Sequence, residues 1–195
     1  MPDAPLNVLV LTLGSHGDVH PFVGLGMQLR DLGHRVTVLT NPHFEALVES
    51  HGLAFTPVGT KEDFDRFADD PAVWSRTRGG VAVLKALGQF IRVSYDALAS
   101  ELRDNTVVVS STLGLSARIL QDARGVPVVT CHLAPFVFRS LTSPPVVAGL
   151  PPLEWLPRSV QQHLWNGADR FVLDRALGEV NSLRRELDLE PVEGI

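Results

Sequence analysis

The feature that most constrains this chain is a regular alternation of short apolar runs with stretches of helical periodicity. The runs are rich in valine and leucine and predict five strands, at residues 6–13, 35–40, 53–58, 106–110 and 126–131. Strands separated by helices are joined by crossovers and therefore lie parallel. The sequence predicts an α/β fold, a Rossmann-like doubly wound parallel sheet flanked by helices.

Helix boundaries follow from proline, glycine and capping residues. We expect the first helix to begin at Pro21 and to end at Gly33, and Asp70-Pro71 to begin another. Apolar residues from Leu84 to Leu102 predict one long helix, and two separate helices are expected after Ser159.

Length and composition indicate one folded domain. A chain of 195 residues can hold one α/β domain, which we divide into a core at 1–132, a proline-rich loop at 133–158 and helices at 159–195. The formal charge of -5 comes from 22 acidic and 17 scattered basic residues, which argues against a nucleic-acid partner. The single cysteine, Cys131, cannot form an internal disulfide and is expected in the core.

The apolar run at residues 6–13 could be mistaken for a targeting segment. It lacks a preceding basic region and is too short to span a bilayer. We interpret it as a buried strand and expect the protein in the cytoplasm.

The most informative segment is the loop Gly14-Ser15-His16-Gly17-Asp18-Val19-His20-Pro21. It follows the first strand, where this fold places ligands. The dinucleotide pattern G-x-G-x-x-G is absent, and Thr40 and Asn41 stand where an acidic residue would hold a ribose, so a dinucleotide-dependent oxidoreductase is disfavoured. The Lys and Ser/Thr of a P-loop are missing as well.

The same loop offers one carboxylate and two imidazoles close to a helix N-terminus. Such groups can hold a hydroxyl-bearing ligand and accept its proton. No cluster of metal-ligating residues is visible, and we predict no metal site.

The run L-G-S-H-G-D-V-H-P-F, followed by G-H-R-V-T-V-L-T, resembles the N-terminal signature of GT-B glycosyltransferases of the sterol, glycolipid and antibiotic group. The usual form in that group is T-x-G-S-R-G-D-V-x-P-F, then G-H-x-V, so His16 replaces an arginine. Segments 108–120, 125–130 and 181–189 resemble the same half of the fold.

The resemblance implies an acceptor-binding domain in which Asp18 is the general base and His20 shares that task. It also implies that the acceptor is contacted by the strand-end loops, through Gly14, Ser15, His16, Gly17, Ser111, Thr112, His132, Pro135 and Phe136. The structural alternative is that Asp18 only caps the helix expected at Pro21 and that His20 lies on the surface. Ser111 and Thr112 could likewise cap a helix, and His132 could be a hydrogen-bonded strand end.

Aromatic side chains could form the walls of an acceptor pocket or part of the core. They are Trp74, Phe90, Phe138 and Trp155. The segments at 136–139 and 155–158 could instead touch a membrane surface or a lipid acceptor.

In this group the nucleotide-sugar donor is held mainly by a second, C-terminal domain, and no donor motif is present in this chain. The resemblance therefore implies a UDP- or dTDP-sugar as co-substrate, no tightly bound cofactor, and a donor domain in cis or a donor subunit in trans. The chain alone is expected to be an inactive half of a hexosyltransferase acting on a small-molecule or lipid acceptor. The competing interpretation is a non-catalytic Rossmann-like module that binds a ligand or a protein.

Overall fold

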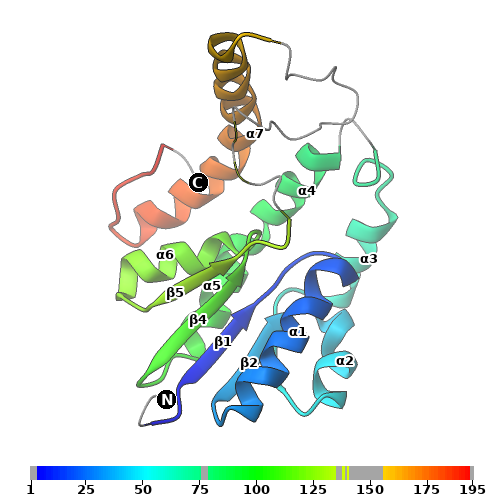
Figure 1. Cartoon of the computed structure of the whole chain (residues 1–195), viewed down its shortest axis with the longest axis vertical. Helices are drawn as coiled ribbons and strands as arrows, with labels where there is room; N and C mark the ends of the chain where they lie inside the picture. The colour runs from blue at the N-terminus through cyan, green and yellow to red at the C-terminus, as the bar shows by residue number, and fades with distance from the viewer. Residues whose placement is uncertain (1–3, 76–78, 135–137, 139, 141–155, 194–195) are drawn as a thin grey trace.

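The computed structural model describes residues 4–75, 79–134, 138, 140 and 156–193. A five-stranded sheet runs through it in the order β3-β2-β1-β4-β5, and every neighbouring pair is parallel. Figure 1 shows β1, β2, β4 and β5 of this sheet. Helices flank the sheet, so the predicted α/β fold is confirmed.

Each strand lies within its predicted range or extends one residue beyond it. The strands are β1 Asn7–Leu11, β2 Arg35–Thr40, β3 Ala54–Pro57, β4 Thr106–Ser111 and β5 Val128–Cys131. The central strand β1 is buried along its whole length, because it has a neighbouring strand on each side and helices over each face. This burial is the reason for its continuous apolar sequence.

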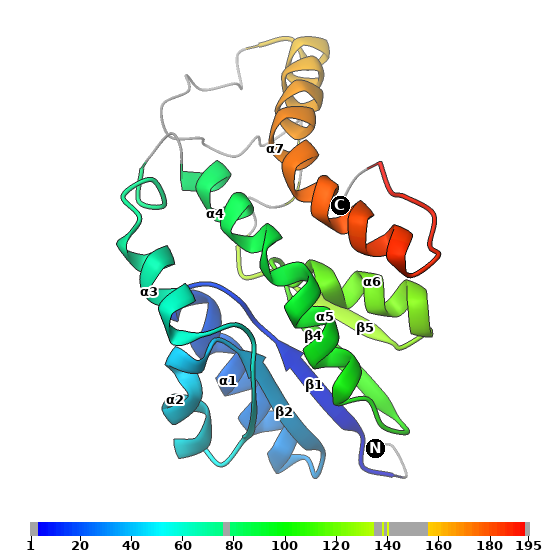
Figure 2. The ribbon, with the colours of Figure 1, turned by 180° about the vertical axis from the view of Figure 1, so that it is seen from behind.

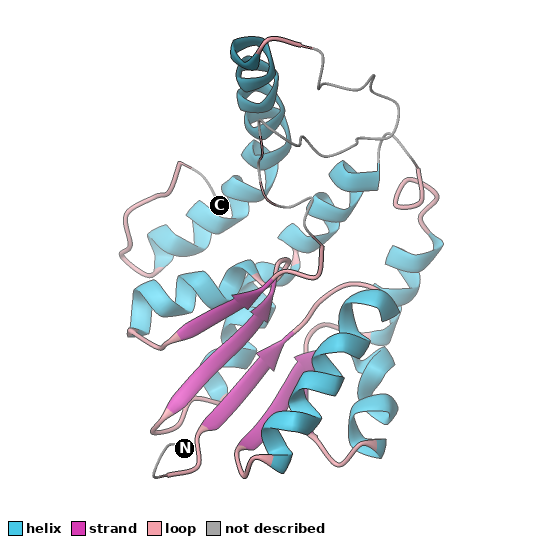
Figure 3. Cartoon of the chain, viewed as in Figure 1, coloured by secondary structure: helices cyan, strands magenta, loops and turns pink. Residues whose placement is uncertain are grey.

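Helices cover both faces and the upper end of the sheet (Figures 2 and 3). They are α1 His16–Asp31, the 3-10 helix η1 Pro42–Phe44, α2 Glu45–Ser50, α3 Lys61–Asp69, α4 Gly79–Gly88, α5 Phe90–Ser100, α6 Leu115–Arg124 and α7 Arg158–Glu186. The helices α1 and α2 lie on one face, and α5 and α6 lie on the other.

Alternation along β1 divides the core into two layers. Val10 belongs to a buried cluster with Phe22 and Phe44, on the face covered by α1 and α2. Leu9 and Leu98 belong to a second cluster, on the face covered by α5 and α6. Successive side chains of a strand point to opposite faces, so one strand supplies both layers.

Two expected helix starts were wrong. The helix α1 begins at His16, with Ser15 as its N-cap, and Pro21 lies inside it. Capping at Ser15 sets the start five residues earlier, although Pro21 has no N–H to donate to the helix. Asp70 closes α3 instead of opening a helix, and its carboxylate accepts a hydrogen bond from the Ala72 N–H at 2.8 Å, which forms a turn.

Two helix counts were also wrong. The single long helix expected from Leu84 to Leu102 is divided into α4 and α5 at Gln89. The two helices expected after Ser159 are one 29-residue helix, α7. No proline interrupts α7, and Leu177, Val180 and Leu183 are buried near its C-terminal end, where the helix packs on the core.

The strand order reverses between β1 and β4, because the chain continues from β1 to β2 on one side and returns to β4 on the other. Ligands of open α/β sheets bind beyond the carboxyl ends of strands at such a reversal. Within the described part of the chain, no helix combines the length and apolar character needed to cross a membrane.

Candidate functional site

The loop between β1 and α1 places the carboxylate of Asp18 against the backbone of Gly14. Gly14 has φ +126°, which side chains with a Cβ rarely adopt. A Cβ at this position would lie 2.8 Å from the Asp18 Cγ. Glycine is therefore required at position 14 for both conformation and space.

Asp18 is the third residue of α1 and is held by the residues around it. Its Oδ2 accepts hydrogen bonds from the Ser15 N–H at 2.8 Å and the Ser15 hydroxyl at 2.9 Å. The fully buried Thr12 donates its hydroxyl to the backbone carbonyl of Asp18 at 3.0 Å. The carboxylate thus takes part in capping α1, and its second oxygen, Oδ1, meets no hydrogen-bond donor among the described residues.

Asp18 also lines a cavity of about 510 Å³, which we call the Asp18 cavity. It lies beyond the carboxyl ends of β1, β4 and β5, with α3 and α4 on its other side. Its lining residues are Gly14, Ser15, Asp18, Phe67, Val73, Trp74, Gly80, Val83, Leu84, Ser111, Thr112, Leu113, Leu133 and Ala134. A cavity of this size suits a small organic molecule.

The wall of the Asp18 cavity is mostly apolar, and Asp18 is the one charged group among the described lining residues. Trp74 and Leu133 are 67% and 48% exposed, so apolar surface of the cavity wall meets solvent. The arrangement can hold an apolar molecule and offer a single carboxylate to one of its hydroxyl groups.

Ser111 and Thr112 reach the same cavity from the end of β4. The Ser111 side chain is buried, and its hydroxyl has no hydrogen-bond partner in the described structure. The Thr112 hydroxyl lies 3.0 Å from the His132 Nδ1. His132 itself lines a neighbouring cavity and contacts the Phe138 ring at 4.9 Å between centroids.

His16 and His20 lie apart from the described lining of the Asp18 cavity. Their rings stack at 5.5 Å between centroids, and His16 also contacts Phe44 at 5.0 Å. His43 stacks on Phe64 of α3 at 3.9 Å. The histidines therefore belong to an aromatic cluster that attaches α3 to the start of α1.

The remaining residues singled out in the sequence lie in three different places. Gly17 lies exposed in the first turn of α1. Pro135, Phe136 and Trp155 lie outside the described residues. Cys131, expected in the core, is a free cysteine of intermediate exposure that packs against the edge of the core.

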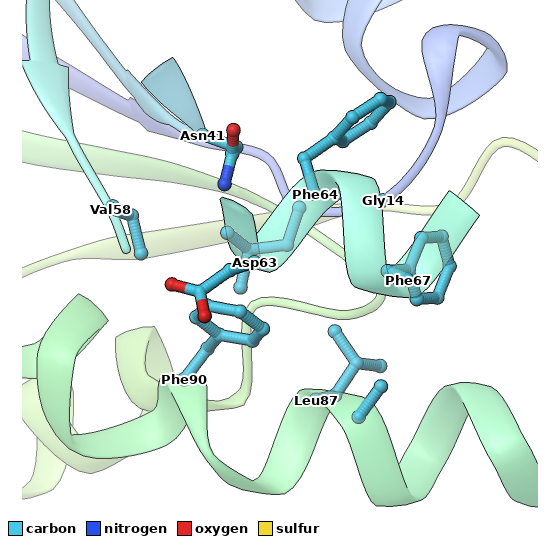
Figure 4. A pocket seen from close by; sticks show the side chains of 10 residues that line it. Gly14, Asn41, Val58, Asp63, Phe64, Phe67, Leu87 and Phe90 are labelled. Atoms are coloured by element: carbon cyan, nitrogen blue, oxygen red, sulfur yellow. The ribbon is translucent and has the colours of Figure 1, made fainter. Parts of the chain in front are cut away.

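A small pocket of about 40 Å³ lies beside the Asp18 cavity, under α3 (Figure 4). Phe90 and Asp63 line it. Burial raises the pKa of the Asp63 carboxyl, but hydrogen bonds from Thr60 and Arg66 together outweigh burial and lower that pKa from its ordinary value of 3.8. The pocket has room for water and not for a substrate.

The described residues contain no group of His, Cys, Asp and Glu side chains that could hold a metal ion. Asn41, at the end of β2, donates its amide to the Thr60 carbonyl and accepts from the His43 N–H. Both of its polar atoms are engaged in local structure, as expected of a cap and not of a ribose ligand.

Several cavity residues were missed by the sequence analysis: Phe67, Val73, Val83, Leu84 and Leu133. Phe67 did carry a signal, because Phe64 and Phe67 stand three residues apart in the otherwise charged segment of α3. Such a pair predicts an apolar face on a polar helix.

Known proteins resemble this chain in both sequence and fold. The profile of the glycosyltransferase family 28 N-terminal domain matches residues 8–130. A sterol 3-beta-glucosyltransferase of Neurospora crassa is 42% identical over 57 residues, which are 29% of this chain and 4% of that protein. One from Sclerotinia sclerotiorum is 27% identical over 148 residues, which are 73% of this chain and 9% of that protein.

The fold also matches solved structures. The Streptomyces sp. SF2575 glycosyltransferase SsfS6, complexed with thymidine diphosphate, superposes with a TM-score of 0.59 at 18% identity. The match covers 97% of this chain and 48% of SsfS6. The chain thus spans about half of this structural neighbour and less than a tenth of the two sequence relatives.

Proposed function

Because the chain belongs to the glycosyltransferase family 28 N-terminal domain family, we propose that it is the acceptor-binding half of a glycosyltransferase. The reaction moves a hexose from a nucleotide-sugar donor to a hydroxyl group of a sterol or another apolar small molecule or lipid. The observation that carries this proposal is the Asp18 cavity, an apolar chamber with one carboxylate in its wall.

In this proposal, Asp18 is the general base. Its carboxylate takes the proton from the acceptor hydroxyl while the hydroxyl oxygen attacks the anomeric carbon of the donor sugar. A new C–O bond forms, and the bond from the anomeric carbon to the diphosphate breaks, with its electron pair leaving on the nucleoside diphosphate. Direct displacement of this kind inverts the anomeric configuration. Base assistance of this type contributes about 10² to 10⁴ in rate.

The fixed position of the carboxylate supports this role. Ser15 holds Oδ2, so Oδ1 is the oxygen that we assign to proton transfer. Gly14 lets the Asp18 carboxylate lie directly against the backbone of the loop. Ser111 and Thr112, at the end of the neighbouring strand β4, are proposed to contact the acceptor as well.

The other predicted contacts have less support. His16, Gly17 and His20 lie at the same loop but outside the described cavity lining, so we propose no direct acceptor contact for them from this structure. His132 is proposed to affect acceptor binding indirectly, through its contact with the Thr112 hydroxyl. Roles for Pro135 and Phe136 rest on the resemblance alone.

The donor is proposed to be a UDP- or dTDP-sugar that binds as a substrate and not as a resident cofactor. The structural neighbour SsfS6 was solved with thymidine diphosphate. A donor-binding domain, in cis or as a separate subunit, would supply most of the donor contacts. The unpaired cysteine suits a reducing compartment, and the proposed location is the cytoplasm.

A transfer assay tests the proposal. This chain is assayed alone and joined to a donor-binding domain, with UDP- and dTDP-sugars and a panel of sterol and other hydroxylated acceptors. Transfer by the joined form only is the expected result. Absence of both transfer and acceptor binding in either form would contradict the proposal.

A non-catalytic binding module is the second candidate. The observation in its favour is that Asp18 takes part in capping α1, which a binding module would need equally. The two candidates differ in what the carboxylate does beyond capping, and replacement of Asp18 by asparagine separates them.

A further inference from the structure

A second cavity of about 510 Å³ lies beside the Asp18 cavity, and we call it the α6–α7 cavity. It is bounded by α4, α6, α7, the ends of β4 and β5, and Val192 after α7. Leu84, Ser111, Thr112 and Leu113 line both cavities. The α6–α7 cavity differs from its neighbour in charge, because its described lining includes several ionisable groups: Arg118, Asp122, His132 and Arg184.

One carboxylate in the α6–α7 cavity faces two guanidinium groups. The Asp122 Oδ2 lies 2.5 Å from the Arg184 Nη1, and the Asp122 Oδ1 lies 3.7 Å from the Arg118 Nε. Arg184 is nearly buried and also donates to the Glu190 carbonyl at 2.7 Å, so its position is fixed. Arg118 is 75% exposed, and among the described residues it pairs with Asp122 alone, through this longer contact. Together, the described lining residues Arg118, Arg184 and Asp122 leave one positive charge in excess.

The start of α6 adds hydrogen-bond donors to the same cavity. Gly114 is the N-cap of α6 and provides no side-chain acceptor, and both Gly114 and Leu115 line the cavity. A Cβ at position 114 would lie 2.9 Å from the Leu11 Cδ2 and closer still to the Ser110 Oγ. Packing therefore keeps a capping side chain out, and the first amides of α6 favour a negative group.

Ser111, which lines both cavities, supplies a second observation. The residue is 4% exposed, lines the cavity, and has a hydroxyl without a hydrogen-bond partner in the described structure. Buried hydroxyl groups in folded proteins are nearly always paired. A negatively charged group in the cavity would accept from this hydroxyl and would also meet Arg118.

We propose that the α6–α7 cavity binds an amphipathic organic anion, with a carboxylate or phosphate on an apolar body. The anionic group lies among Arg118, Ser111 and the start of α6, and the apolar body lies against Leu87, Ile119 and Val180. The inference does not depend on Asp18 acting as a base, because Asp18 is absent from the described lining of this cavity.

A matched pair of dyes tests the charge requirement. The protein is titrated by fluorescence with 1-anilinonaphthalene-8-sulfonate and with N-phenyl-1-naphthylamine, which has the same rings without the sulfonate. Arg118→Gln is expected to weaken binding of the sulfonate dye about tenfold, as loss of one charged hydrogen bond would, and to leave the neutral dye unchanged. Arg92→Gln is the control, since Arg92 pairs with Asp96 and Glu186 on the surface.

Two further measurements locate the ligand and identify its charged group. Leu115→Trp, which narrows the α6–α7 cavity, should abolish binding of the sulfonate dye, whereas Trp74→Ala, in the Asp18 cavity, should leave it unchanged. Dodecyl phosphate and dodecanoate should displace the dye and 1-dodecanol should not, and the stronger of the two anions identifies the preferred group. Equal effects of Arg118→Gln and Arg92→Gln, or loss of the dye in Trp74→Ala alone, would overturn the proposal.

Discussion

Ser15 donates two hydrogen bonds to one oxygen of Asp18, from its N–H at 2.8 Å and from its hydroxyl at 2.9 Å. A carboxylate held in this way can present only its other oxygen to a substrate. Capping of α1 and proton transfer are therefore compatible roles for the same side chain. The position of Asp18 depends on residue 15 as much as on the helix.

The first prediction concerns Ser15. Ser15→Ala removes the hydroxyl donor and should lower the free energy of unfolding by about 1 kcal/mol. It should also reduce transfer by the joined enzyme about tenfold, because the carboxylate is less firmly placed. Urea unfolding and single-turnover transfer measure the two effects. Ser15→Thr keeps a hydroxyl and should recover most of the transfer rate; equal rates for Ser15→Ala and the unchanged protein would refute the assigned role.

The second prediction concerns Gly14. Gly14→Ala should lower the free energy of unfolding by roughly 1 kcal/mol or more, because the positive φ is strained, and the new Cβ should displace the Asp18 carboxylate. The rate of sugar transfer should fall by more than the loss of folded protein can explain. Gly24→Ala is the matched control, since Gly24 is exposed within α1 and a Cβ added there would meet no atom within 4 Å. That variant should be stabilised by about 0.5–1 kcal/mol and keep full activity.

The third prediction concerns acid stability. The pKa of Asp63 is lowered, so its ionised form stabilises the folded state above the ordinary value of 3.8, and this contribution is lost as pH falls through the lower folded-state pKa. The stability difference between the unchanged protein and Asp63→Asn should therefore shrink between about pH 5 and pH 2. Urea unfolding at several pH values measures it. A stability difference that stays constant with pH would contradict a stabilising role for the ionised Asp63 carboxylate at the start of α3.

The fourth prediction concerns the exposed wall of the Asp18 cavity. Trp74→Ala should weaken binding of a radiolabelled sterol about tenfold in equilibrium dialysis, because the indole offers a large apolar surface. Stability should change little, since Trp74 is 67% exposed. Leu32→Ala is the control, because Leu32 is 60% exposed at the end of α1 and lies outside the described cavity lining. Equal sterol affinity in both variants would mean that Trp74 does not contribute to sterol binding.

The strands could be predicted from sequence because their burial leaves a direct trace. A parallel strand covered on both faces is apolar throughout, and β1 and β2 lie where their apolar runs placed them. Helix starts were less certain because local signals compete. Pro21 is a valid first residue, but Ser15 with Asp18 three residues later is the stronger start, and Thr60 with Asp63 opens α3 at the same spacing.

The position of Asp18 in a strand-end loop could also be predicted, because the fold places ligands there. The cavity wall could not. Phe67 and Leu133 are 66 residues apart in sequence and meet only through the tertiary fold. The orientation of the histidines could not be predicted from sequence either, because it depends on the packing of Phe64 against His43.

Replacement of Asp18 by asparagine tests the central claim most directly. Asparagine can still accept a hydrogen bond from Ser15 but is a far weaker base, and Asp63→Asn serves as a matched control in the other capping box. We predict that single-turnover transfer by the joined enzyme falls about 10² to 10⁴-fold in Asp18→Asn, with acceptor affinity retained, and is unchanged in Asp63→Asn. If Asp18→Asn transfers sugar as fast as Asp63→Asn and differs only in stability, Asp18 is a helix cap and not the base.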